Sequence, residues 1–162
     1  MRILATLLAI PIYLVLAPAP AQAAAPPFVV IVAADVDERS LSRETLSFIF
    51  QRKQNFWKNG KRIQPVNLPP AHALRRAFSE CVLGQEPEAL GDYWREMYFH
   101  GVLPPHVLES EEAVVLFVNS TPGAIGYVSA CMPNMHAKVV FTVGDAPNCP
   151  KRSASCLSLQ DG

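Results

Sequence analysis

The sequence has 162 residues, and its 14 lysines and arginines balance its 14 aspartates and glutamates, so the formal net charge at pH 7 is zero. Hydrophobic residues make up 50% of the chain, which at this length is enough for one domain with a single core. A neutral chain lacks the basic face that attracts nucleic acids. We therefore expect no nucleic-acid partner.

The N-terminus has the organisation of a cleavable signal peptide. Arg2 supplies a positive charge, residues 3–16 are almost entirely apolar, and residues 21–23 (AQA) have the small-x-small pattern that a signal peptidase requires. A membrane anchor, the alternative, needs about 20 consecutive apolar residues, whereas this run is shorter and contains Pro11. Residues 1–23 therefore predict export to the periplasm of a bacterium, with a mature chain that does not insert into the membrane.

The first part of the mature chain predicts a buried strand followed by a helix. Residues 24–27 form a short leader, and the apolar run FVVIVAA at 28–34 is typical of a strand buried on both faces. Ser42 is a suitable N-cap for the helix that follows. Apolar residues recur on this helix at spacings of three and four, and they define its buried face: Leu46, Ile49 and Phe50.

The middle of the chain predicts one short strand and two helices. Residues 63–68 form a strand that ends at a Pro-Pro pair, and residues 72–83 form a helix with one apolar side. Residues 86–99 form a second helix, which begins near a proline. We expect four of its side chains to point into the core: Leu90, Tyr93, Trp94 and Met97.

The last part of the chain predicts a third helix, at 110–118, and two further strands, at 124–128 and 138–143. Strands that alternate with helices are the pattern of an α/β domain. We therefore expect a central mixed sheet flanked by helices within residues 28–145, followed by a cysteine-containing tail at 146–162.

All four cysteines fall in the predicted mature chain. An even number of cysteines in an oxidising compartment favours two disulfides, and four cysteines allow three pairings. The simplest arrangement closes the short polar loop between Cys149 and Cys156, which leaves Cys81 to pair with Cys131. A metal site that uses these thiols and His136 is the alternative, but the CxxC pairs of structural zinc sites are absent from the sequence. We expect neither a metal nor a cofactor.

Several segments of the chain, taken in order, resemble the periplasmic phosphate-binding proteins of ABC importers. They are FVVIVA at 28–33, SLSRETL at 40–46, IFQRKQNFWKNGKRIQPVN at 49–67, RRAFSECVLG at 75–84 and STPGAIGYV at 120–128. The resemblance implies a type II periplasmic binding protein-like fold, in which two α/β lobes clamp the ligand. This chain matches the second lobe only, because the loop that provides the first lobe's phosphate contacts has no counterpart in it.

The loop after the strand at 63–68 departs from the family pattern. The family carries Arg, Asp, Ser and Thr there, and the corresponding positions of this sequence are Leu68, Pro70, His72 and Leu74. A helix N-terminus remains, and its free N–H groups attract anions. Since the charged ligands are missing, the resemblance implies at most weak binding of phosphate or another small oxyanion.

The resemblance also suggests which residues would hold that anion. His72 and Arg75 lie at the start of the helix, and Ser120 and Thr121 belong to a loop that faces the ligand cleft in this family. Each residue has a structural interpretation as well: the arginine as a solvated charge, the histidine as a helix-start residue, and the two hydroxyls as capping or turn residues. Both interpretations stay open at this point.

Two functions follow from the sequence. The first is an exported solute-binding-type module, related to the phosphate ABC transporter substrate-binding proteins, that binds an oxyanion weakly. The second is an interaction module that has kept this fold, has lost the ligand and binds another protein of the cell envelope. The sequence contains no nucleophile elbow, zinc-protease pair or P-loop motif, so we expect no enzymatic activity.

Overall fold

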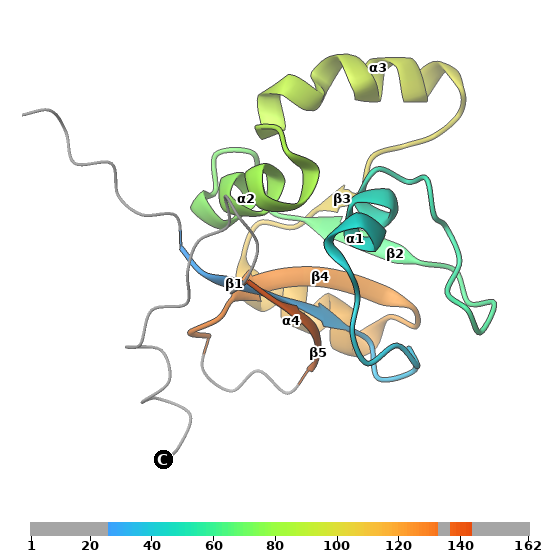
Figure 1. The fold of residues 1–162 in the computed structure, drawn as a ribbon, viewed down its shortest axis with the longest axis vertical. Coiled ribbons are helices and arrows are strands. Elements are labelled where there is room, and N and C mark those ends of the chain that lie inside the picture. The colour runs from blue at the N-terminus through green and yellow to red at the C-terminus, as the bar shows by residue number, and fades with distance from the viewer. Residues whose placement is uncertain (1–25, 133–136, 144–162) are drawn as a thin grey trace, which may run out of the picture.

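The computed structural model describes residues 26–132 and 137–143, which form one α/β fold around a single sheet (Figure 1). The strands of this part are β1 (Phe28–Val32), β2 (Gln64–Asn67), β3 (His106–Val107), β4 (Ala124–Ser129) and β5 (Lys138–Thr142), in the spatial order β3-β2-β4-β1-β5. Its α-helices are α1 (Arg43–Phe50), α2 (Ala73–Phe78), α3 (Gly91–Phe99) and α4 (Glu111–Ser120). A π-helical turn at Ser79–Leu83 extends α2, and a short 3-10 helix at Pro87–Leu90 precedes α3.

The sheet is mixed, as the sequence predicts. Strand β1 pairs antiparallel with β4 and β5, whereas β2 pairs parallel with β3 and β4. Every residue of β1 is buried, because the strand has a neighbour on each side and a covered face above and below. The predicted strands at 28–34, 63–68, 124–128 and 138–143 are confirmed. Strand β3 was not predicted, since two residues are too few to show a periodicity.

Hydroxyl side chains cap two of the helices. Ser42 Oγ accepts a hydrogen bond from the Thr45 N–H at 3.1 Å before α1, and Ser110 Oγ accepts one from the Ala113 N–H at 3.2 Å before α4. These bonds satisfy N–H groups that have no partner within the helix. The buried face of α1 is the predicted one: Leu46, Ile49 and Phe50.

Helices cover both faces of the sheet (Figure 1). On one face, Phe50 of α1 and Phe78 of α2 pack on Tyr127 of β4, and the rings of Phe78 and Tyr127 stack with their centroids 4.1 Å apart. On the other face, α4 lies so close to β4 that a Cβ atom on Gly126 would overlap the side chain of Val114. The missing side chain of this glycine permits the close approach of the helix.

The helix at 86–99 turns the predicted face inward, but three of its four predicted side chains, Tyr93, Trp94 and Met97, are only half-buried. Leu90 is buried, but α3 itself contains no buried residue, and its last two residues are among the most exposed aromatics described. Figure 1 shows the reason: α3 lies at the periphery, beyond α2 and away from the sheet. Its apolar pattern is used locally instead, where Tyr93 and Trp94 form an edge-to-face ring pair.

The signal peptide and the C-terminal tail lie outside the described residues, as do Cys149 and Cys156. Cys81 is buried, Cys131 follows β4, and neither is a free thiol. The predicted pairing of the four cysteines therefore stays a prediction. Among the described residues, no helix is long and apolar enough to cross a membrane.

Candidate functional site

A buried polar cluster lies where β2 ends and α2 begins. The guanidinium of Arg75 donates a hydrogen bond from Nη1 to Oδ1 of Asn67, the last residue of β2. The Tyr127 hydroxyl lies 3.4 Å from the same oxygen, and it accepts a hydrogen bond from the Leu68 N–H at 3.2 Å. Arg75 is only 6% exposed and Asn67 is 4% exposed, so the sequence alternative of a solvated arginine is wrong.

The charge of Arg75 has no acidic partner among the described residues. No aspartate or glutamate of this part of the chain forms an ion pair with it, and its Nε atom is buried without a hydrogen-bond acceptor. A buried charge that lacks a counterion is costly for a fold. Burial raises the pKa of Tyr127, and the nearby Arg75 charge opposes that rise. The arginine is therefore a cation with unused donor capacity.

His72 occupies the N-cap position of α2. Its Nδ1 atom accepts a hydrogen bond from the Leu74 N–H at 3.2 Å, which is the structural role that a helix-start histidine can have. A neutral imidazole that accepts through Nδ1 carries its proton on Nε2 and can donate from there. His72 and Arg75 therefore lie at the same helix start, as the sequence predicts.

Ser120 and Thr121 lie at the other end of the sheet. They precede β4, and β4 begins beside the start of β2, because the two strands are parallel and Gln64 pairs with Ala124. Arg75 follows the end of β2. In addition, the Ser120 hydroxyl donates to the Leu116 carbonyl at 2.8 Å within α4. The structure therefore does not bring the two predicted halves of the site together.

The carboxyl ends of β2 and β3 lie where the chain divides between the two faces of the sheet. The helix after β2, α2, packs on the face of Tyr127, whereas the helix after β3, α4, packs on the face of Gly126. Open α/β sheets hold their ligands outside the carboxyl ends of strands at such a point. Arg75 and Asn67 lie at this end of the sheet.

The start of α4 lies near the same end but carries negative charge. Glu111 and Glu112 occupy its first turn, and Glu111 Oε2 accepts the Ser129 N–H at 2.6 Å. The backbone amide and the Ser110 hydroxyl hydrogen-bond Glu112, and these bonds lower the pKa of that carboxyl. The carboxylates of α4 therefore repel an anion, whereas the Arg75 guanidinium of α2 attracts one.

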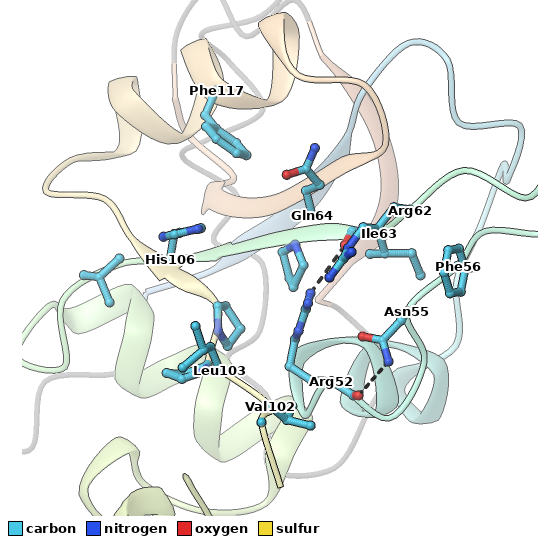
Figure 2. Close-up of a pocket in the computed structure, with 15 residues that line it drawn as sticks. Arg52, Asn55, Phe56, Arg62, Ile63, Gln64, Val102, Leu103, His106 and Phe117 are labelled. Atoms are coloured by element: carbon cyan, nitrogen blue, oxygen red, sulfur yellow. Dashed lines mark hydrogen bonds between the residues drawn. The ribbon is translucent and has the colours of Figure 1, made fainter. Parts of the chain in front are cut away.

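A second feature, which the sequence did not predict, is a cavity of about 940 Å³ on the β3 side of the sheet (Figure 2). Its walls come from the segment after α1, the start of β2, the segment that leads into β3, and Phe117 of α4. Two arginines, Arg52 and Arg62, line it beside mostly apolar residues. They are separated in sequence by a turn, and only the fold reveals that they share one cavity.

No protein-family model and no curated protein sequence matches the chain. Its fold is similar to that of an ABC-type phosphate transport receptor from Vibrio cholerae, with a TM-score of 0.57 and 19% identity over 72% of this chain and 46% of the receptor. A second similar structure is a putative phosphate ABC transporter substrate-binding protein with bound phosphate from Clostridium perfringens, with a TM-score of 0.58 and 21% identity over 72% of this chain and 45% of that one.

A third similar structure is a possible phosphate binding protein from Planctomyces limnophilus, with a TM-score of 0.56 and 15% identity over 83% of this chain and 48% of that one. The chain thus spans about half the length of the solved structures that it matches. It has the fold of the phosphate ABC transporter substrate-binding proteins, over one part of their length.

Proposed function

We propose that the protein is an exported solute-binding-type module that binds phosphate or another small oxyanion weakly, with Arg75 as the principal cation. The single observation that carries this proposal is the burial of Arg75 at the carboxyl end of β2 without an acidic partner among the described residues. An oxyanion would supply the missing counterion, and a guanidinium can donate two parallel hydrogen bonds to it. The likeness to phosphate-binding structures supports the same ligand class.

The expected affinity is low because few ligands are in place. The positions that correspond to the family's Arg and Asp are Leu68 and Pro70, and Leu68 is 1% exposed, within the core. We expect a dissociation constant of about 1 mM, which corresponds to about −4 kcal/mol.

Calorimetric titration of the mature protein with phosphate and sulfate tests the proposal. Arg75→Gln should abolish the heat of binding, whereas Arg75→Lys, which keeps the charge, should retain part of it. The matched control is Arg76→Gln, because Arg76 is the adjacent residue but is exposed and paired with Glu86 and Glu88. Micromolar binding, or unchanged binding by a folded Arg75→Gln protein, would place the anion elsewhere.

The second function, binding to another envelope protein, is favoured by one specific observation. The side chains of Tyr98 and Phe99 at the end of α3 are 65% and 81% exposed. Exposed aromatic side chains are typical of protein interfaces. A photo-crosslinking residue introduced at Phe99 should then capture a discrete protein in the periplasm of the source cell, and one at exposed Lys58 should not. A protein that binds phosphate as above and gives no crosslink would exclude this alternative.

A further inference from the structure

The cavity on the β3 side of the sheet combines an apolar lining with an uncompensated positive charge. It is lined by Phe56, Ile63, Leu103, Val107 and Phe117, and by the two arginines, whereas none of its lining residues is an aspartate or glutamate. Figure 2 shows Arg52 extending from the end of α1 toward β2, with Arg62 beside Ile63. A volume of about 940 Å³ is in the range of small-molecule sites.

The arginines are not neutralised within the described part of the chain. Neither forms an ion pair there; Arg52 donates one long hydrogen bond, of 3.4 Å, to the Ile63 carbonyl, and its Nε atom is buried without an acceptor. Burial and the neighbouring Arg62 charge lower the pKa of Arg52. Two cations that line one partly apolar wall repel each other, and a bound anion between them would offset this repulsion.

The backbone of Arg52 gives an independent reason to look for a role of its side chain. Arg52 has a φ of 60°, in the left-handed region. It follows α1 at the position where helices usually place glycine, and the hydrogen bonds from the N–H groups of Arg52 and Lys53 to the carbonyls of Ile49 and Phe48 are those of a Schellman motif. An arginine there is strained, and strain of this kind is concentrated at functional sites.

We propose that this cavity binds an organic anion with an apolar body, whose anionic group is held by Arg52 and Arg62. The apolar body would contact Leu103, Val107 and Phe117, and burial of these partly exposed side chains would drive binding. Phosphate lacks such a body and does not fit this chemistry. The proposal is thus independent of the oxyanion site, because neither Arg75 nor Asn67 lines this cavity.

Two dyes with the same aromatic body test the proposal by fluorescence. Anilinonaphthalene sulfonate carries an anionic group, and N-phenylnaphthylamine is its neutral counterpart. The folded protein should bind the sulfonate at least about fivefold more tightly than the neutral dye, because two charged donors meet the anion. Arg52→Gly and Arg62→Gln should each weaken sulfonate binding about fivefold and leave binding of the neutral dye unchanged.

The variants also separate binding from folding. Arg52→Gly relieves the left-handed strain, so it should not lower the midpoint of urea unfolding while it weakens sulfonate binding. The control is Arg95→Gln, which removes an exposed arginine that pairs with Asp92 on α3 and should leave sulfonate binding unchanged. Equal binding of the two dyes, or equal effects of the Arg52, Arg62 and Arg95 substitutions, would overturn the proposal. A protein that does not bind phosphate but gives the expected dye results would contradict the proposed oxyanion site and still support this cavity as a site for an organic anion.

Discussion

The backbone N–H and carbonyl of Gly123 form hydrogen bonds to three other segments of the chain. Its N–H donates to Oδ1 of Asp35 at 3.1 Å, and its carbonyl accepts from the Trp57 indole at 2.9 Å and from the Gln64 N–H at 3.1 Å. Gly123 has a φ of 72°, and a Cβ atom there would collide with the Arg62 carbonyl. One residue just before β4 thus contacts the segment after β1, the turn before β2 and the start of β2.

This arrangement predicts that Gly123→Ala is strongly destabilising. The left-handed conformation alone costs alanine about 1 kcal/mol, and the collision with backbone should add at least about 2 kcal/mol. The control is Gly60→Ala, because Gly60 has a φ of 81° but nothing within 4 Å of an added Cβ. Urea unfolding should show a loss of about 1 kcal/mol for Gly60→Ala and a much larger one for Gly123→Ala. Equal losses would mean that the Gly123 contacts do not matter.

The carboxyl of Asp35, which accepts the Gly123 N–H, should make the stability of the fold depend on pH. The hydrogen bond from the Gly123 N–H and the Lys61 ammonium, 3.0 Å away, lower the pKa of this carboxyl below its ordinary value of 3.8. A depressed pKa in the folded state stabilises the fold above pH 3.8, and this contribution is lost as the pH falls through the folded-state pKa. Asp35→Asn should therefore destabilise the protein more at pH 7 than at pH 3. Asp92→Asn on exposed α3 controls for the loss of one negative charge.

At the scale of elements, α3 is the least supported helix of the described chain. It contains no buried residue, and its contacts to the rest of the fold include the hydrogen bond from the Tyr93 hydroxyl to the Gln51 carbonyl, at 2.7 Å, and Lys53 over the Tyr93 ring. Helices in proteins owe most of their stability to the packing of an apolar face. A helix without such packing opens at low free energy.

Hydrogen exchange should show this difference. The amides of α3 should exchange much faster than those of β4, which lies in the interior of the sheet. Tyr93→Phe removes the hydrogen bond to Gln51 and should accelerate exchange in α3 further, whereas Tyr98→Phe changes an exposed ring and should not. Protection of α3 as strong as that of β4 would contradict this description of the helix.

The elements also show what the sequence could predict. Buried strands such as β1 can be predicted from the sequence because their apolar runs are continuous. Helix α1 can be predicted because the N-cap Ser42 and the spacing of its apolar residues indicate the same first turn. The inward face of α3 is the predicted one but is only half-buried, since periodicity identifies an apolar face and does not show how near the helix lies to the core. The pairing of the strands determines which predicted site residues meet. Because β2 and β4 are parallel, Ser120, which precedes β4, and Arg75, which follows β2, lie at opposite ends of these strands. No local sequence pattern reveals this pairing.

At the scale of the whole molecule, export is the prediction that lies outside the described residues. If residues 1–23 are a signal peptide, protein recovered from the periplasm should begin at Ala24, since cleavage follows the small residues before it. Intact-mass measurement of the recovered protein checks this start directly. A chain that still begins at Met1 would contradict export by cleavage.

The same sample tests the predicted disulfides. An oxidising compartment and four cysteines predict that alkylation without a reductant labels no thiol, and that reduction exposes all four. Peptide mapping would then show whether Cys149 pairs with Cys156 and Cys81 with Cys131, as expected. Two or more labelled thiols in freshly purified protein would contradict the prediction.

The buried and unpartnered guanidinium of Arg75 is the centre of the proposed function, and NMR of the arginine Nε–Hε groups observes it directly. The Arg75 Nε atom has no acceptor among the described residues, so phosphate binding should shift its Nε–Hε signal, with an apparent dissociation constant of about 1 mM. The signal of Arg76, which is paired with Glu88, should stay in place. An Arg75 signal that phosphate leaves unmoved, while other signals of the protein shift, would contradict the proposed role of this residue.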